Sequence, residues 1–534
     1  MKPAEESRAF RPAEGGSSLR RLAVRGAGAT VLSQSFGFAV QMIATIVLAR
    51  LLTPSDFGLV AMVTTFSLLL MNCGLNGFTE AILQGDAIDP WLTSNLFWIN
   101  IGIGSLLTIA FAGGGTLLAH FYAEPRVTRV AAVMSLTIFF NSFSVIHLAL
   151  LKRAMQFPRV AINDIVARSV SVAVSILLAL SGWDYWALVG GAIALPLSTT
   201  IGAWIAHPWI PALPRRHAGT LPMVRFAMST YGRFVSNYGS NNLDNLLVGW
   251  RFGSVDLGLY KKAYDLFVLP ANQLSAPLTS VAVAALSRLN RDPAQYKRYF
   301  FTALSILAFV GMAIGANLTL VGRDLIRLLL GPRWGEAGRI FTFFGPGIGV
   351  MLLYGTHGWI HLSIGRADRW FRWSLVEIGV TGSLFLGGLH WGPVGIALAW
   401  VASFWILTLP ALWYAGKPAG ILITEVVASV WRYVVASALA GCACALIIQA
   451  IPSFAPASSA IGSVARMLTI SLLFASLYLG VVIGLHRGCT PLYQVASVFR
   501  DLFPSARFSR SSPSLTSPHG ADTGAVLTAT EGTT

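Results

Sequence analysis

A succession of long apolar runs, which follow one another along most of the chain, restricts the possible folds more than any other feature. Because a helix crosses a bilayer with about 20 residues, each run is long enough to form one membrane span. Only 11% of the 534 residues are charged, against about 25% in a soluble domain. The sequence therefore predicts an all-α polytopic membrane protein with 14 spans, near residues 27–49, 57–82, 93–120, 128–151, 161–181, 186–207, 226–251, 258–285, 299–321, 337–364, 371–390, 393–415, 426–451 and 462–486.

The distribution of basic residues predicts the orientation in the membrane. The formal net charge is +16, which in a soluble protein would suggest nucleic acid as a partner. In a membrane protein, Lys and Arg collect instead in the cytoplasmic loops. Most of the basic residues fall on the side of the N-terminus, so we predict a multi-pass protein of the cytoplasmic (inner) membrane with both termini in the cytoplasm and no nucleic-acid partner. The segment from Gly322 to Gly338 is an exception, because it is basic on the opposite face.

Two similar strings indicate that the membrane part is duplicated. Arg50-Leu-Leu-Thr-Pro-Ser-Asp56-Phe-Gly58 and Arg251-Phe-Gly-Ser-Val-Asp256-Leu-Gly258 each join two apolar runs. Because six predicted spans separate the strings, the two halves would share one orientation, as parallel repeats do. The predicted organisation is a cytoplasmic tail (1–26), a six-helix bundle (27–207), a cytoplasmic linker (208–225), a second six-helix bundle (226–415), two additional helices (416–487) and a disordered cytoplasmic tail (488–534).

The seventh predicted span is the most polar one and carries a polar stripe. Arg233, Asn237, Asn241 and Asp244 follow at helical spacing, so they share one face of the helix. A charge inside a membrane costs at least about 3 kcal/mol, and such a stripe should face other helices or a water-filled cavity. Two interpretations stay open: the stripe lines a cavity, which we favour for its length, or it joins helices by polar contacts.

Each residue of the stripe has a functional and a structural interpretation. The guanidinium of Arg233 could bind phosphate with two parallel hydrogen bonds, or it could pair with a carboxylate of the bundle. Asn237 and Asn241 could bind sugar hydroxyls, or bridge helices. Asp244 could hold a coupling proton or cation, or position Arg233 indirectly.

Other polar residues inside or at the ends of spans are secondary candidates. Arg50 and Arg251 occupy equivalent positions of the repeat, and they rim a cavity or anchor helices. Glu377 is a second carboxylate that could couple transport to an ion. His357 and His361 are spaced four residues apart without the glutamate of a zinc-protease motif, so we interpret them as packing or hydrogen-bonding groups. We predict no metal and no other cofactor.

Local spacing predicts two self-neutralised pairs and one kink. Asp164 precedes Arg168, and Lys261 precedes Asp265, by one helical turn, so each pair can neutralise itself. The string Gly345-Pro-Gly-Ile-Gly interrupts the tenth predicted span, and a bend is expected there.

Several strings, in the expected order, resemble polysaccharide exporters of the O-antigen flippase type. These exporters belong to the multidrug/oligosaccharidyl-lipid/polysaccharide (MOP) flippase superfamily. The resemblance covers about residues 30 to 400. It rests on Leu48-Ala-Arg50-Leu-Leu-Thr-Pro54-Ser-Asp56-Phe-Gly58, Asn72-Cys-Gly74-Leu, Ala81-Ile-Leu-Gln84, His120-Phe-Tyr122-Ala-Glu124-Pro125, Leu151-Lys-Arg153-Ala-Met-Gln-Phe157, Asn242-Leu-Asp244-Asn-Leu-Leu-Val-Gly249, Asp256-Leu-Gly258-Leu-Tyr260-Lys-Lys-Ala263-Tyr264 and Ala285-Leu-Ser287-Arg288.

The resemblance implies a fold, a partner and a function. The fold is two six-helix bundles facing each other in a V, as in multidrug transporters of the superfamily. The partner is a polyprenyl-diphosphate-linked oligosaccharide in a lipid membrane, moved across the cytoplasmic membrane by alternating access, with a proton or sodium ion as a possible coupling ion. This implies substrate contacts for Arg233, Asn237, Asn241, Arg50 and Arg251 and ion coupling for Asp244 and Glu377.

Two other functions are weighed against a flippase. A drug or cation antiporter of the same superfamily commonly has an acidic residue in the first span, and residues 27–49 contain none. A membrane polymerase or ligase acting on lipid-linked sugars would need a large outer loop or a cluster of catalytic groups. The predicted outer loops are short, so we expect a transporter rather than an enzyme.

Overall fold

The computed structural model describes residues 16–84, 88–215, 220–451, 459–489 and 493. Within its helices, the side chains of residues 16–27, 73–76, 84, 229–230, 232–233, 236–237, 240, 274, 276–277, 280 and 367 are not described. Residues up to Arg487 form one compact unit. Of the predicted tail 488–534, only residues 488, 489 and 493 are among the described residues.

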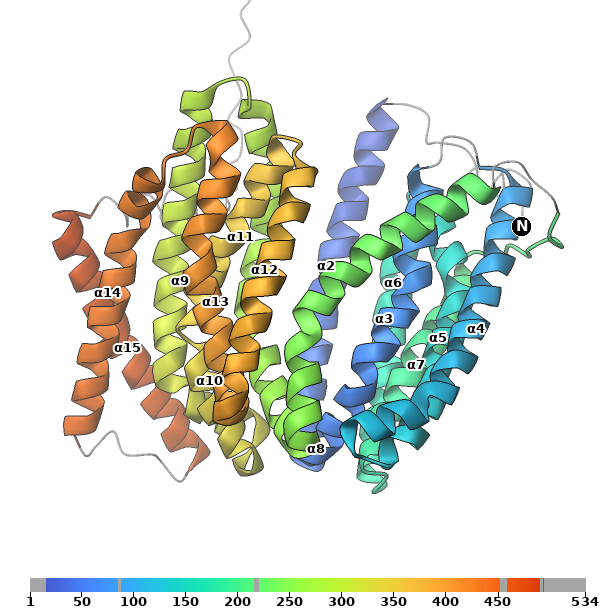
Figure 1. Cartoon of the computed structure of the whole chain (residues 1–534), viewed down its shortest axis with the longest axis horizontal. Coiled ribbons are helices and arrows are strands. Elements are labelled where there is room, and N and C mark those ends of the chain that lie inside the picture. The colour runs from blue at the N-terminus through green and yellow to red at the C-terminus, as the bar shows by residue number, and fades with distance from the viewer. Residues whose placement is uncertain (1–15, 85–87, 216–219, 452–458, 490–492, 494–534) are drawn as a thin grey trace, which may run out of the picture. The chain divides into compact units, whose positions relative to one another are not determined.

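In the part of the chain that the structure describes, six helices precede the long polar helix, and consecutive helices run in opposite directions (Figure 1). Short loops connect them, and proline or aspartate near several helix starts matches the residues favoured at helix N-termini. The helices are α2 (Gly16–Leu51), α3 (Pro54–Gln84), α4 (Pro90–Tyr122), α5 (Arg126–Arg153), α6 (Phe157–Leu180) and α7 (Tyr185–Ala206).

The second part of the chain begins with α8 (Thr220–Leu289), which is bent at Gly253. Its first arm, residues 220–252, and second arm, residues 254–289, correspond to the seventh and eighth predicted spans. The remaining helices are α9 (Pro293–Leu330), η1 (Pro332–Trp334), α10 (Gly335–Phe344), α11 (Gly347–Ser363), α12 (Ala367–Gly388), η2 (Leu389–Trp391), α13 (Gly392–Gly416), η3 (Lys417–Ala419), α14 (Ile423–Ala450) and α15 (Ala460–His486).

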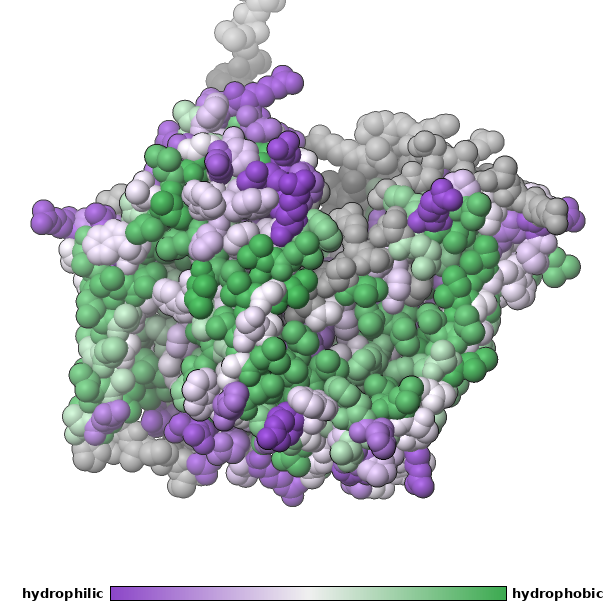
Figure 2. Space-filling view, in the orientation of Figure 1, coloured by the Kyte–Doolittle hydropathy of each residue, from purple (hydrophilic) through white to green (hydrophobic). Residues whose placement is uncertain are grey.

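The prediction of an all-α polytopic membrane protein is confirmed. Among the described residues, ten helical stretches are long and apolar enough to span a membrane, or eleven when the bent pair α10–α11 is counted as one span. The two arms of α8 are not among these stretches, and the stretch Asp368–Ala419 joins two predicted spans into one. The count of 14 spans therefore stays a prediction. Figure 2 shows an apolar belt between two hydrophilic edges, as a lipid bilayer requires.

Helix boundaries differ from the predicted spans in ways that have local causes. Helix α2 begins at Gly16, inside the segment predicted as a tail, although its apolar part begins at Gly28. A helix can continue into water beyond its lipid-embedded part, because its backbone hydrogen bonds do not depend on the solvent. The kink predicted at Gly345-Pro is present, since the chain bends by 53° between α10 and α11.

The long helix α8 lies between the earlier and the later helices (Figure 1). It packs extensively on α3, and it also contacts α4, α10, α11 and α13. The predicted two bundles and their boundaries remain a proposal, because the described part up to Arg487 forms one compact unit.

The two repeated strings meet each other at the face opposite the N-terminus of α2. A Cβ atom added to Gly58 would lie 1.7 Å from the carbonyl oxygen of Ser254, and one added to Gly258 would lie 1.9 Å from that of Pro54. The hydroxyls of Ser55 and Ser254 are 3.1 Å apart. Because the backbones touch directly, only glycine fits at Gly58 and Gly258.

The same face also holds contacts between α2 and the turn after α9. Trp334 donates from Nε1 to the carbonyl oxygen of Ala49 at 2.8 Å, and its ring packs edge-on against Phe57 at 5.4 Å between ring centroids. Trp334 is fully buried. This face is therefore tightly packed between segments that lie almost 300 residues apart.

A partly buried ion pair joins α15 to α9, and its loss is expected to destabilise the protein. Arg466 of α15 pairs with Asp324 of α9, and the two side chains are only 15% and 13% exposed. Asp324→Ala removes the carboxylate that pairs with the guanidinium, which we expect to cost about 3 kcal/mol of unfolding free energy. Thermal unfolding in detergent measures this loss.

Glu336→Ala provides the control for this prediction. Glu336 pairs with Arg339 at 3.6 Å, but both side chains are more than half exposed, and exposed pairs contribute about 0–1 kcal/mol. Equal losses of stability in the two variants would show that the Arg466–Asp324 pair does not stabilise the folded protein.

Candidate functional site

The candidate site is built on the two arms of α8. Gly253 separates them, with a φ of 81° and a ψ of −171° that interrupt the helix. Tyr231 and Tyr238, two turns apart on one face of the first arm, donate from their hydroxyls to carbonyl oxygens of α3, each at 2.9 Å. These bonds fix the rotation of the first arm about its axis, so that the face carrying Asp244 is directed away from α3.

Asp244 is completely buried and joins three segments of the second part of the chain. Its Oδ2 accepts hydrogen bonds from the hydroxyl of Tyr260 at 2.8 Å and from Nε1 of Trp400 at 2.9 Å. Tyr260 belongs to the second arm of α8, and Trp400 belongs to α13. The carboxylate therefore holds the two arms of α8 and α13 together.

A pocket of about 280 Å³ opens beside this junction. Two polar residues that the sequence singled out, Asn241 and Glu377, both line it, and the Glu377 carboxyl contacts the Tyr354 hydroxyl. That hydroxyl also accepts a hydrogen bond from Nε1 of Trp373 at 3.0 Å. The other lining residues are mainly aromatic or small polar: Tyr264, Ala271, Ser275, Thr279, Leu307, Met351, Leu352, Gly355, Trp359, Trp400 and Phe404.

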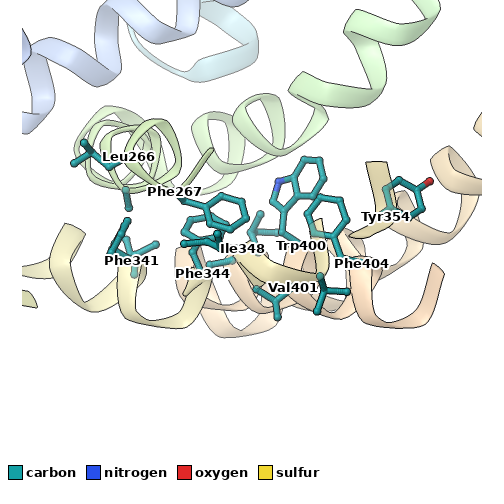
Figure 3. Close-up of a cluster of buried hydrophobic side chains, with 14 of the residues drawn as sticks. Leu266, Phe267, Phe341, Phe344, Ile348, Tyr354, Trp400, Val401 and Phe404 are labelled. Carbon is teal, nitrogen blue, oxygen red and sulfur yellow. The ribbon is translucent and has the colours of Figure 1, made fainter. Parts of the chain in front are cut away.

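Aromatic side chains form the wall between the pocket and the core. Figure 3 shows Trp400 and Phe404 side by side on α13 with Tyr354 nearby, and their contacts continue to Phe344 and Phe267. The rings of Trp400 and Phe404 stack at 5.4 Å, and those of Phe267 and Phe344 at 4.7 Å. This packing gives the pocket a rigid aromatic side in addition to its amide and carboxylate groups.

The pocket can bind a molecule that has both apolar faces and polar edges. A sugar ring offers C–H faces that pack on aromatic rings, and hydroxyl edges that hydrogen-bond to amides and carboxylates. An organic cation would also fit, because aromatic rings and a carboxylate attract positive charge.

The structure places the residues of the predicted stripe unequally. Asn241 lines the pocket, and Asp244 lies just behind its wall, bonded to the lining residue Trp400. The backbone of Arg233 and Asn237 is helical within α8, but their side chains are outside the described residues. Their substrate contacts stay predictions.

Arg50 and Arg251 do not line this pocket. Arg50 donates to the carbonyl oxygens of Leu328 at 2.6 Å and Leu329 at 3.3 Å, so it binds the end of α9. Arg251 is exposed, and its guanidinium carbon lies 5.9 Å from the ring centroid of Phe252. The hydrogen bonds of Arg50 join α2 to α9, and the substrate contacts expected for Arg50 and Arg251 stay predictions.

The predicted helical ion pairs are present outside the pocket. Arg168 and Asp164 are 3.0 Å apart, and Lys261 and Asp265 are 2.5 Å apart. Each pair neutralises itself as predicted.

The two histidines of α11 are buried among aromatic rings, as predicted. The ring of His357 lies 4.6 Å from that of Tyr354, and Nδ1 is 2.5 Å from the Tyr354 carbonyl oxygen. His361 stacks on Trp370 with a centroid distance of 6.5 Å.

Sequence reasoning missed the aromatic part of the site. Tyr354, Trp359 and Trp400 line the pocket, and Trp359 donates from Nε1 to the hydroxyl of Thr279 at 2.9 Å. One signal was available: tryptophans usually gather at the membrane interfaces, whereas Trp359 and Trp400 fall inside predicted spans. Their polar N–H groups therefore had to find partners within the bundle.

The string from His120 to Pro125 has a local structural role. Ala123 ends α4 in the left-handed conformation, with a φ of 52°. Glu124 then accepts two hydrogen bonds from Arg126, both at 2.9 Å, and the Arg126 hydrogen bond lowers the pKa of the Glu124 carboxyl. The pair stabilises the turn between α4 and α5 at the membrane surface.

The helices and the pocket define a polytopic membrane protein with a fold known from lipid and drug transporters. The inward closed structure of the lipid II flippase MurJ superposes with a TM-score of 0.66 over 86% of this chain and 100% of that chain, at 14% identity. An inward-facing multidrug resistance MATE family transporter of the MOP superfamily superposes with a TM-score of 0.58 over 72% of this chain and 94% of that chain, at 14% identity.

The chain belongs to the polysaccharide biosynthesis protein family, whose model matches residues 47–339. Among its relatives are the succinoglycan biosynthesis transport protein ExoT of Rhizobium meliloti (strain 1021), 21% identical over 72% of this chain and 78% of that protein, and the lipopolysaccharide biosynthesis protein WzxC of Escherichia coli (strain K12), 20% identical over 78% and 85%. The resemblance inferred from the sequence strings is thereby confirmed.

Proposed function

We propose that this protein is a flippase for polyprenyl-diphosphate-linked oligosaccharide. It would move a repeat unit of an exopolysaccharide, capsule or O-antigen across the cytoplasmic membrane by alternating access, with both termini in the cytoplasm. The observation that carries the proposal is the pocket lined by Asn241, Glu377 and aromatic rings, in which Asn241 lies on α8, the helix that also carries Arg233. The family and the relatives, whose names refer to polysaccharide biosynthesis and transport, support it.

Different residues of the protein would bind the sugars and the diphosphate of such a substrate. The aromatic and polar groups of the pocket would bind sugar rings, and Arg233 would bind the diphosphate with charge-assisted hydrogen bonds. The lipid chain would stay in the bilayer. Asn237, four residues after Arg233 on α8, would bind sugar hydroxyls next to the diphosphate.

Transport by the native chain and by Arg233→Ala tests the proposal. Purified protein is reconstituted in vesicles, and a labelled lipid-diphosphate oligosaccharide is followed from one leaflet to the other. We expect the Arg233→Ala rate to fall at least about tenfold, because one charge-assisted contact contributes roughly 1.5–3 kcal/mol. The control is Arg298→Ala, which replaces an exposed arginine in the second turn of α9. This variant should transport at the native rate.

The role of Glu377 is tested by imposing an ion gradient. If this carboxylate couples transport to a proton or sodium ion, Glu377→Gln should lower the rate only when a gradient is imposed, and Asp244→Asn is compared in the same way. An equal loss with and without a gradient would assign Glu377 to substrate binding instead. Gln has nearly the same shape as Glu and is polar, so the substitution keeps the pocket polar in both cases.

A drug or cation antiporter is the second candidate function. It is favoured by one observation, the carboxylate of Glu377 among the rings of Tyr354, Trp359 and Trp400, because such a group binds organic cations. Vesicles that export a cationic dye but move none of the lipid-linked sugars would establish the antiporter and contradict the flippase.

A further inference from the structure

A basic pocket of about 420 Å³ lies at the face opposite the N-terminus of α2. The ends of α2 and α9, the turn η1 and the start of α15 line it. Three of its lining residues are arginines, Arg50, Arg327 and Arg333, and none of the lining residues is acidic. The pocket thus collects much of the positive charge that made the segment from Gly322 to Gly338 an exception to the charge rule.

The carboxylates of this segment are already occupied. Asp324 and Glu336 form ion pairs with arginines that do not line the pocket. In the part of the chain that the structure describes, no ion pair includes Arg327 or Arg333. Like charges gathered in one pocket repel each other, so an anion bound among them would stabilise the arrangement.

Two groups of the pocket are held in place for such an anion. Arg50 is fixed by its bonds to the carbonyl oxygens of Leu328 and Leu329, and its other N–H groups remain available. Ser459 caps α15 and accepts from the backbone N–H of Gly462 at 3.0 Å. The N-terminus of α15 adds a positive helix end to the three arginines.

The position of the pocket relates it to lipid headgroups. It lies where α2 and α9 end and α15 begins, at the boundary of three apolar helices. Next to its lining residues, Ile461 is 85% exposed and Val464 is 40% exposed, which suits contact with acyl chains. A phosphate held by the arginines would thus have its lipid chains beside α15.

We propose that this pocket binds the phosphate group of a lipid headgroup in the leaflet at that face. The headgroup belongs either to an anionic phospholipid or to a polyprenyl diphosphate, which share the phosphate that the guanidiniums recognise. One part of this proposal rests on the proposed function: that the leaflet is the outer one and that the polyprenyl diphosphate is the transported carrier. The binding of an anionic phospholipid does not depend on it.

Equilibrium binding of three probes to the full-length protein in neutral detergent tests the proposal. The probes are phosphatidylglycerol, polyprenyl diphosphate and inorganic diphosphate. All proteins carry Arg233→Ala, so that the proposed transport contact does not contribute. We expect R327Q/R333Q to bind the preferred probe at least about tenfold more weakly, since each lost charge-assisted bond contributes about one factor of ten.

The matched control is R323Q/R339Q, which removes two exposed arginines from the same face outside the pocket. It should bind within about twofold of the parent protein, because exposed charges that do not touch a ligand contribute little. If R327Q/R333Q does not fold, Arg333→Gln alone serves as the second variant, because the Arg333 side chain is exposed.

The outcomes separate the sources of the phosphate. Selective loss of phosphatidylglycerol identifies a phospholipid headgroup, and selective loss of polyprenyl diphosphate identifies the carrier lipid. Loss of inorganic diphosphate alone would overturn the lipid assignment. Equal binding by R327Q/R333Q and the parent, or an equal loss in the control, would overturn the site. Because no translocation is measured, a failure here is distinct from a failure of the flippase proposal.

Discussion

Gly58→Val is expected to lower the unfolding free energy by about 3 kcal/mol or more. A Cβ atom at this position would lie 1.7 Å from the carbonyl oxygen of Ser254, and a backbone atom cannot move aside as a flexible side chain can. The start of α3 and the start of the second arm of α8 must therefore separate, which opens a packed interface. Thermal unfolding of the purified protein in detergent measures the effect.

Gly113→Val is the control for this substitution. Gly113 lies within α4, and a Cβ atom there would have nothing within 4 Å. Its replacement should change the stability by no more than about 1 kcal/mol. Equal unfolding temperatures for the two variants would contradict the close contact.

Cross-linking gives an independent readout of the same contact. The hydroxyls of Ser55 and Ser254 are 3.1 Å apart, so S55C/S254C, in a chain whose native cysteines are replaced by serine, should form a disulfide under mild oxidation. Adding Gly58→Val should prevent the cross-link while Gly113→Val should not. If the proposed alternating access opens this face, the cross-linked protein should not transport and reduction should restore the rate.

Asp244→Leu is expected to cost about 4 kcal/mol of unfolding free energy. The substitution leaves the hydroxyl of Tyr260 and Nε1 of Trp400 without their acceptor, and each buried unsatisfied donor costs about 1–3 kcal/mol. Asp244→Asn should cost less, because its amide oxygen can still accept both bonds. Unfolding in detergent measures both variants.

Two further variants make the second prediction specific. Asp265→Asn removes a carboxylate from the same helix, but Asp265 is 41% exposed and pairs with Lys261 one turn away, so it should cost less than about 1 kcal/mol. Adding Tyr260→Phe to Asp244→Leu should recover part of the stability, since one unsatisfied donor disappears. A loss of the same size for Asp244→Leu and Asp265→Asn would rule out the buried junction.

The elements of the fold follow largely from local sequence. The first predicted span, 27–49, nearly coincides with the apolar stretch Gly28–Leu51, and the kink at Gly345-Pro is where α10 ends and α11 begins. Apolar length, proline and glycine act on their own neighbourhood, so their effects can be deduced without the rest of the chain. The same holds for the pairs Arg168–Asp164 and Lys261–Asp265, whose partners lie one turn apart.

The candidate site was only partly within reach of this reasoning. Helical spacing placed Asn241 and Asp244 on one face of α8, but it could not indicate that Asn241 lines a pocket while Asp244 is covered by Trp400. That difference depends on α13, which lies 156 positions further along the chain. Glu377 was singled out as a carboxylate inside a span, yet its neighbour Tyr354 belongs to another helix.

By itself, the sequence determined that the chain is a polytopic helical membrane protein, and its strings already resembled the family to which it belongs. Only the tertiary structure decided which segments meet: Gly58 with Ser254, Trp400 with Asp244, and Arg50 with Arg327 and Arg333 in one pocket. The physical reason is that hydropathy and helical periodicity act over a few turns. The face with which a helix packs on distant helices is set instead by the combined fit of all their side chains.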